Sequence, residues 1–102
     1  MRRSVERCLD LLDGKKKIDI FEPARVDKST PIETTIKALD EYVKAGKIGG
    51  ISLSEVSADT VQRAVKVTQI VGCEVELSLW ATDIFKNGVA AACAEHGIPI
   101  VA

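Results

Sequence analysis

The feature that most constrains this chain is a repeated unit in which a short apolar run leads through a small polar loop to a helix cap. In the clearest copy, Ile48 to Leu53 is predicted to be a buried strand, Ser54 and Glu55 form the loop, and Ser57 caps the next helix. Parallel α/β sheets and barrels place their functional groups at the carboxyl ends of the strands. We therefore expect Ser54 and Glu55 to lie on the rim of any site.

The same unit recurs along the whole chain. The connections between successive strands are long enough for right-handed parallel crossovers. The strongest local signal is Thr30-Pro31-Ile32-Glu33, which predicts a capping box at a helix start. The apolar spacing predicts helices over residues 4–13, 30–46, 57–68 and 82–97, alternating with strands over residues 18–21, 48–53, 72–79 and 98–102.

Four parallel strands with alternating helices fit two α/β architectures. One is a complete doubly wound sheet, and the other is half of a (β/α)8 barrel, whose whole needs about 250 residues. No Gly-x-Gly-x-x-Gly or Gly-x-x-x-x-Gly-Lys-Ser/Thr motif supports a doubly wound nucleotide fold. The last predicted strand is apolar, and its unpaired edge would invite association. We therefore favour the half barrel of about four βα units, with residues 1–102 as one partial domain.

Composition excludes several classes of function. The net charge is −1, from 14 basic and 15 acidic residues, which argues against nucleic acid and anionic membranes as partners. No apolar run approaches the roughly 20 residues of a membrane span. Cys8, Cys73 and Cys93 show no C-x-x-C spacing, each falls at an apolar position of its element, and the residues after Met1 lack the apolar run from which a signal peptide would be expected. A cytoplasmic location is therefore expected, and the only histidine, His96, has no partner at metal-ligand spacing.

Four segments together resemble the aldo-keto reductases. Residues 18–27 are similar to the fourth-strand segment I-D-L-Y-x-x-H-R-V-D of that superfamily, and residues 50–57 to the fifth-strand segment I-G-L-S-E-V-S. Residues 74–80 resemble the sixth-strand motif Q-x-E-Y-S-L-W, and residues 88–102 resemble the following helix and strand. The resemblance covers essentially the whole chain, in order. The unusual fourth-strand segment is most similar to that of fungal pyridoxal reductases.

The resemblance implies the central segment of an NADPH-dependent carbonyl reductase on a (β/α)8 barrel, with small aldehydes such as pyridoxal as substrates. Its members use a tyrosine as proton donor, assisted by an aspartate, a lysine and a histidine. The first three would precede Met1, and the histidine would fall on Ala24. The phosphate-binding loops would follow Ala102. The resemblance therefore implies no catalytic residue in this chain, which we expect to be inactive alone.

The resemblance does place part of a cofactor wall here. Ser54 and Glu55 occupy the positions that the family uses near the nicotinamide carboxamide, and Glu74 stands where a glutamine usually binds the same amide. Leu77 stands where an aromatic residue usually stacks on the ring. Replacing glutamine by glutamate loses an amide donor, and leucine offers no π face. Binding of NADPH is therefore expected to be weak or lost.

Other interpretations remain open at this stage. Glu74 and Glu76 share one face of a strand and could form the acid/base pair of a hydrolase. Arg25 and Asp27 could bind a polar substrate, although an ordinary loop salt bridge is the simpler expectation. Trp80 either rims a pocket or packs under its loop. A rival function is a non-catalytic half-barrel scaffold that forms a homodimer through its exposed strand edges.

Overall fold

The computed structural model describes residues 1–102, and its centre is a parallel sheet. Strands β1 (Ser52–Ser54), β2 (Gly72–Glu74) and β3 (Ile100–Val101) pair in the order β1-β2-β3. An earlier segment pairs with the residues just before β1 through two isolated parallel bridges, Ile18 with Ile48 and Phe21 with Ile51. The prediction of four parallel strand segments alternating with helices is confirmed.

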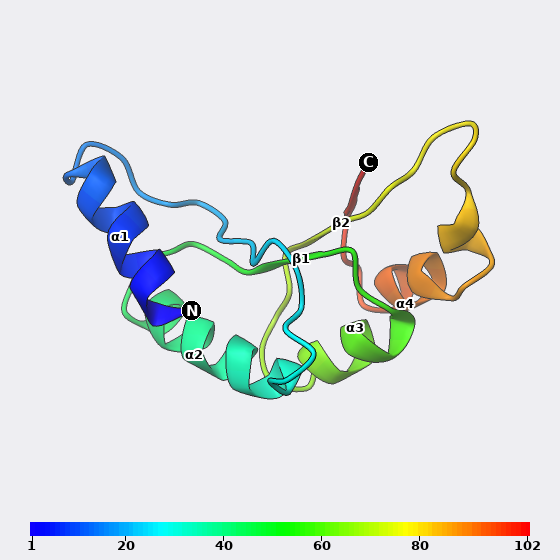
Figure 1. The fold of residues 1–102 in the computed structure, drawn as a ribbon, viewed down its shortest axis with the longest axis horizontal. Helices are drawn as coiled ribbons and strands as arrows, with labels where there is room; N and C mark the ends of the chain where they lie inside the picture. Colours follow the sequence, from blue (N-terminus) through cyan, green and yellow to red (C-terminus); the bar gives the residue numbers. More distant parts are fainter.

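The helices cover one face of this sheet and leave the other face open (Figure 1). None of them combines the length and the apolar character that crossing a membrane requires. The helical elements are α1 (Arg2–Leu12), α2 (Ile32–Lys44), α3 (Ala58–Ala64), the 3-10 helix η1 (Asp83–Phe85) and α4 (Val89–Glu95).

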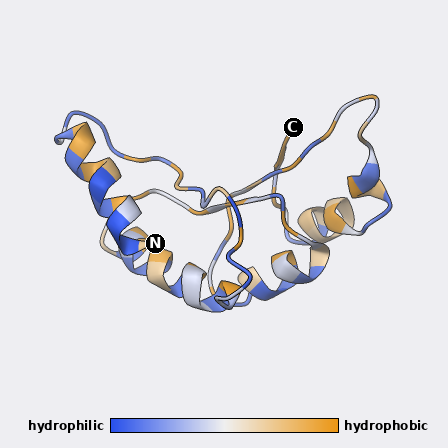
Figure 2. Cartoon of the chain, in the orientation of Figure 1, coloured by the Kyte–Doolittle hydropathy of each residue, from blue (hydrophilic) through white to orange (hydrophobic).

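The hydrophobic core lies between the sheet and the helices. Ile36 and Leu39 of α2 and Val61 of α3 are fully buried, and full burial stabilises by about 1.5–3 kcal/mol for each such side chain. Leu53 and Cys73 are register partners on β1 and β2, and both join this core. In Figure 2 hydrophobic and hydrophilic bands alternate along the helices, as expected for helices with one buried face.

The cysteine prediction is confirmed for two residues and wrong for the third. Cys73 and Cys93 are buried where β2 packs against α4, whereas Cys8 is exposed on α1. Burial raises the pKa of the Cys73 thiol to about 12, and it also raises the pKa of Cys93. Both buried cysteines therefore stay protonated and behave as small hydrophobic residues.

Of the two predicted helix caps, one is confirmed and one is wrong. Ser57 caps α3, because its hydroxyl accepts the N–H of Thr60 at 3.2 Å. Thr30 makes no such bond, since its hydroxyl donates to Asp27 Oδ2 at 2.9 Å. Helix α2 begins after Pro31 without a side-chain cap, and Glu33 pairs with Arg63 on α3. Bonds to Asp27 and Arg63 therefore replace the two bonds of the predicted capping box.

The predicted helix over residues 82–97 is wrong as a single element. It is divided into η1 and α4 at Gly88, whose φ of 87° cannot continue a right-handed helix. Asn87 reinforces the break, because its side-chain oxygen accepts the N–H of Val89 at 3.1 Å.

The predicted strand over residues 72–79 is too long. Pairing with β3 continues to Val75, whose N–H donates to Val101, but the chain then leaves the sheet. Ser78 closes a local turn, since its hydroxyl accepts the N–H groups of Trp80 and Ala81. Leu79 and Trp80 project from this turn with 91% of their surface exposed.

Candidate functional site

The carboxyl edge of the sheet brings two predicted site residues together. Ser54 ends β1, Glu74 ends β2, and the two are register partners. Register partners in a parallel sheet project to the same side, and alternation along each strand places them opposite Leu53 and Cys73. Ser54 and Glu74 therefore lie on the face that the helices leave open.

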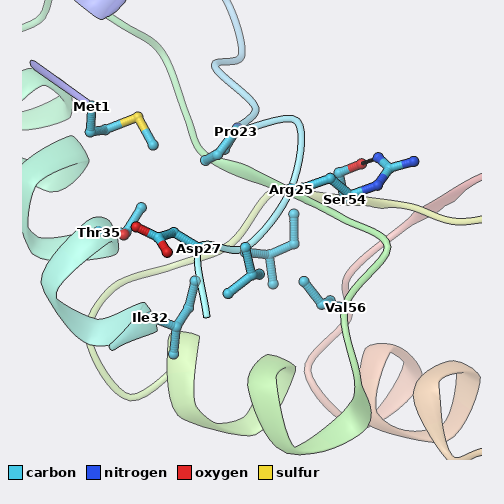
Figure 3. A pocket seen from close by; sticks show the side chains of 10 residues that line it. Met1, Pro23, Arg25, Asp27, Ile32, Thr35, Ser54 and Val56 are labelled. Atoms are coloured by element: carbon cyan, nitrogen blue, oxygen red, sulfur yellow. Dashed lines mark hydrogen bonds between the residues drawn. The ribbon is translucent and has the colours of Figure 1, made fainter. Parts of the chain in front are cut away.

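Ser54 is buried beneath the loop that follows residues 18–21. Only 4% of its surface is exposed, and Arg25 Nη1 donates to its hydroxyl oxygen at 3.1 Å. The same nitrogen also donates to the carbonyl of Ala24 at 2.6 Å, which holds the guanidinium in place. Figure 3 shows the Arg25 side chain lying beside Ser54. In this hydrogen bond the Ser54 hydroxyl acts as an acceptor, so it retains its proton as a donor.

The predicted salt bridge between Arg25 and Asp27 is absent. Asp27 instead accepts the backbone N–H of Ser29 at 2.9 Å and the hydroxyls of Ser29 and Thr30. Figure 3 shows its carboxylate directed toward Thr35, away from Arg25. The hydrogen bond from the Ser29 hydroxyl lowers the pKa of Asp27. Asp27 therefore shapes the loop, and Arg25 remains free for Ser54.

A second polar pair on the same face involves Glu22, which the sequence reasoning overlooked. The hydroxyl of Ser52, a buried residue two positions before Ser54, donates to Glu22 Oε2. Glu22 directly follows the predicted strand 18–21, and that position could have identified it. Together with the pair of Arg25 and Ser54, it fixes the loop over β1.

Glu55 is bound tightly to the neighbouring strand. Its N–H donates to the carbonyl of Glu74 at 2.9 Å, and its Oε1 accepts the N–H of Glu76 at 2.7 Å. Its φ is 50°, a left-handed conformation that is unfavourable for a residue with a side chain.

The two apolar candidates near β2 lie in different environments. Leu77 is half-buried and packs against the hydrophobic core, so only part of its surface is available to a ligand. Trp80 is almost fully exposed, so the expectation that it packs under its loop is wrong.

The cavity beside Ser54 is small. Its volume is about 50 Å³, and its walls include Pro23, Arg25, Leu53 and Ser54. A pocket for a drug-sized ligand usually encloses about 300–1,000 Å³. Ile32 and Thr35 of α2 also line it, and it is too small to hold any larger part of a cofactor.

Three other residues considered in the sequence lie away from this edge or lack reactive groups. Tyr42 is buried on α2, and its hydroxyl donates to Glu6 at 3.0 Å. His96 directly follows α4, and its Nε2 lies 2.8 Å from Gln62 Oε1. Ala24 has no titratable atom. The carboxyl edge therefore carries carboxylates, a guanidinium and hydroxyls, without tyrosine or histidine.

Comparison with protein families gives a match over the whole chain. The model described as "Aldo/keto reductase family" matches residues 1–102. "Probable pyridoxal reductase 2" from Schizosaccharomyces pombe is 47% identical over 100 residues, covering 98% of this chain and 30% of that protein. "Probable aldo-keto reductase 1" from Glycine max is 43% identical over 101 residues, covering 99% and 29%. The chain thus spans about 30% of the length of these relatives.

Solved structures share the fold of this segment. A thermostable aldo-keto reductase in complex with the inhibitor epalrestat has a TM-score of 0.88 and 27% identity, covering 98% of this chain and 37% of that one. An aldo/keto reductase from Klebsiella pneumoniae in complex with NADP and acetate has a TM-score of 0.82 and 23% identity, covering 100% and 36%. These comparisons confirm the α/β fold as part of a (β/α)8 barrel.

Proposed function

Because this chain belongs to the aldo/keto reductase family, we propose that its carboxyl edge is a nicotinamide-facing wall formed by Ser54, Glu55, Glu74 and Leu77. Residues 1–102 are then one partial domain of an NADPH-dependent oxidoreductase that reduces small aldehydes. Pyridoxal is the proposed substrate, since the relative with 47% identity carries the name of a pyridoxal reductase. Use of NADP by the family is supported by the K. pneumoniae complex.

One observation carries this proposal, namely the pairing of Ser54 with Glu74. A primary carboxamide presents a carbonyl acceptor and an NH₂ donor side by side. Ser54 already accepts from Arg25, so its hydroxyl is left to donate to the carbonyl. The Glu74 carboxylate accepts hydrogen bonds only, so it complements the NH₂ group. Glutamate in place of glutamine at position 74 therefore preserves the hydrogen bond that the side chain accepts from the carboxamide NH₂ group.

The chain's residues fit the carboxamide end of the cofactor and little else. NADPH supplies a hydride when it is bound. Leu77 adds apolar area beside the ring, but its partial burial limits that contact. We therefore expect weak cofactor affinity for this chain, dominated by the two hydrogen bonds at the edge.

The proposed inactivity of the chain alone rests on the lack of a proton donor at the edge. Tyr42 is the only tyrosine, and its hydroxyl is bound to Glu6 between α1 and α2. Ala24 provides no acid at the position where the family resemblance implies histidine. Reduction of an aldehyde requires protonation of the developing alkoxide. A side chain positioned to donate that proton contributes typically 10²–10⁴-fold to the rate.

The wall is tested by nuclear magnetic resonance with 1-methylnicotinamide, a cation that carries the carboxamide and the oxidised ring. The carboxylate of Glu74 favours this positive charge. We expect the amide signals of Ser54 and Glu74 to shift on titration, with a smaller shift at Leu77. Shifts confined to other surfaces would refute the wall.

Catalysis by the chain alone is tested by following NADPH absorbance in the presence of pyridoxal. No steady oxidation above the protein-free rate is expected. Sustained turnover that scales with the concentration of the chain would contradict the proposed inactivity.

A second candidate function, a self-associating half barrel, is favoured by the two outer strand segments. Residues 18–21 pair only with residues 48–51, and β3 pairs only with β2. Ile20 and Val101 on these segments are also exposed, at 53% and 51% of their surfaces. Such outer segments can pair with another chain. Sedimentation across a range of concentrations distinguishes this candidate, since a constant monomer mass would exclude it.

A further inference from the structure

We propose that Glu55 is a positioning residue that holds Glu74 at the carboxyl edge and acts through the backbone of β2. This inference rests on the proposed function, because it concerns the same wall. It assigns Glu55 a role other than direct contact with the cofactor.

The hydrogen bonds of Glu55 enclose the end of β2. The carbonyl of Glu74 accepts the Glu55 N–H, and the N–H of Glu76 donates to Glu55 Oε1. On the opposite side of the strand, the N–H of Val75 donates to the carbonyl of Val101 on β3. The backbone from Glu74 to Glu76 is thus bound on both sides.

The backbone conformation of Glu55 explains why a side chain is needed here. After Ser54, the left-handed φ of 50° turns the chain away from β2. No backbone carbonyl accepts the N–H of Glu76. The carboxylate of Glu55 is the acceptor instead, at 2.7 Å. A charged acceptor makes this hydrogen bond stronger than a neutral one.

The conformation is also unusual within this chain. Asp13 is the only other non-glycine residue with positive φ, and it ends helix α1, where left-handed residues are common. Glu55 has no helix end to explain its conformation. Backbone strain of this kind persists where surrounding interactions impose it and is concentrated at functional sites. Here the two hydrogen bonds to β2 impose it.

Direct contact and positioning make opposite predictions for Glu55→Gln. The glutamine keeps an oxygen that can accept from Glu76, but it removes the negative charge. If Glu55 positions Glu74, this variant retains 1-methylnicotinamide affinity within about twofold, because the acceptor remains. If Glu55 acts by its charge on the ligand, the same variant loses affinity.

The matched variant is Glu55→Gly, which adopts the left-handed conformation without strain but lacks an acceptor. We expect the amide of Glu76 to exchange its hydrogen about tenfold faster in this variant, and the affinity for 1-methylnicotinamide to fall by a similar factor. The experiment therefore compares hydrogen exchange at Glu76 and ligand titration in the wild-type chain and both variants.

The outcomes separate the two proposals. Positioning is supported if Glu55→Gln keeps both the slow hydrogen exchange of the Glu76 amide and the affinity for 1-methylnicotinamide, while Glu55→Gly loses both. Equal loss of affinity in the two variants overturns it, as does unchanged exchange at Glu76 in Glu55→Gly. If the wild-type chain does not bind the ligand but Glu76 responds as expected, the proposed function fails while the backbone role of Glu55 is supported.

Discussion

Arg25 and Ser54 are 29 positions apart in the sequence, yet Arg25 Nη1 lies 3.1 Å from the hydroxyl oxygen of Ser54. This hydrogen bond joins the loop after residues 18–21 to the end of β1. It also occupies an acceptor site of the hydroxyl, so the hydroxyl proton is directed to a different partner. The guanidinium thereby leaves Ser54 the role of hydrogen-bond donor to the carbonyl of a carboxamide.

Removal of Arg25 should weaken ligand binding at this edge. In Arg25→Ala the Ser54 hydroxyl can rotate and donate elsewhere, so we expect affinity for 1-methylnicotinamide to fall by about three- to tenfold, as for the loss of one hydrogen bond. The measurement is the same resonance titration. Arg2→Ala is the matched control, because Arg2 pairs with Glu41 on the exposed surface of the helices. Equal affinities for Arg25→Ala and the control would contradict this role.

The stability of the packing between α2 and α3 should depend on pH through Glu33. Two hydrogen bonds of 2.7 Å from Arg63 lower the pKa of Glu33 from 4.5 to about 2. A carboxylate with a lowered pKa stabilises the folded state above its unfolded pKa, and this contribution is lost as the pH falls toward 2. Glu33→Gln should therefore lower Tm by a few degrees at pH 6 and by much less at pH 2.

The control for this titration is Asp59→Asn. Asp59 lies 3.7 Å from Arg63 but is 78% exposed, so it should contribute little. Thermal unfolding of both variants across this pH range checks the prediction. A Tm difference between the wild-type chain and Glu33→Gln that is independent of pH would contradict it.

Gly49 should be required for the pairing of residues 18–21 with β1. A Cβ atom at this position would lie only 2.4 Å from the backbone carbonyl oxygen of Asp19. The backbone would therefore have to move to accommodate it. We expect Gly49→Ala to lower the free energy of unfolding by about 1–3 kcal/mol, as for overpacking. Gly72→Ala is the comparison, since its Cβ would meet only the Ser52 side chain at 3.1 Å. Chemical denaturation should show the larger loss for Gly49→Ala.

The three cysteines should differ sharply in reactivity. Cys8 is exposed, whereas Cys73 and Cys93 are fully buried and burial raises the pKa of both thiols. Since the thiolate is the reactive form, a thiol reagent should modify Cys8 alone in the folded chain and all three residues in denaturant. Mass spectrometry identifies the modified residues. Rapid modification of Cys73 in the folded chain would contradict the buried packing of β2 against α4.

How well each element could be predicted from the sequence depended on how local its signal was. Ser57 caps α3 as predicted, because the bond it makes spans three residues. Thr30 carries an equally strong local pattern, but its hydroxyl is taken by Asp27. Likewise, the turn closed by Ser78 ends the β2 segment earlier than its apolar composition indicates. Local propensity is overridden wherever a nearby side chain offers a competing hydrogen bond.

The candidate site was only partly predictable for a related reason. Ser54 could be placed at a strand end from the repeating pattern. Glu74 is predicted inside the strand over residues 72–79, and its place in the site follows only from the family resemblance. The structure ends β2 at Glu74 and makes the two residues register partners. The contacts that organise them join residues 21 to 30 positions apart, namely Glu55 with Glu76, Arg25 with Ser54, and Glu22 with Ser52. Such pairings depend on loop conformations that a single sequence does not specify.

The most direct test of the central claim compares two ligands that differ only in the group recognised by Ser54 and Glu74. In 1-methylnicotinate a carboxylate replaces the carboxamide of 1-methylnicotinamide. The carboxylate has no N–H to donate to Glu74 and is repelled by its charge. Resonance titration of the wild-type chain should show at least about tenfold tighter binding of the carboxamide, with shifts at Ser54 and Glu74. Equal affinity for the two ligands, or tighter binding of 1-methylnicotinate, would contradict the account.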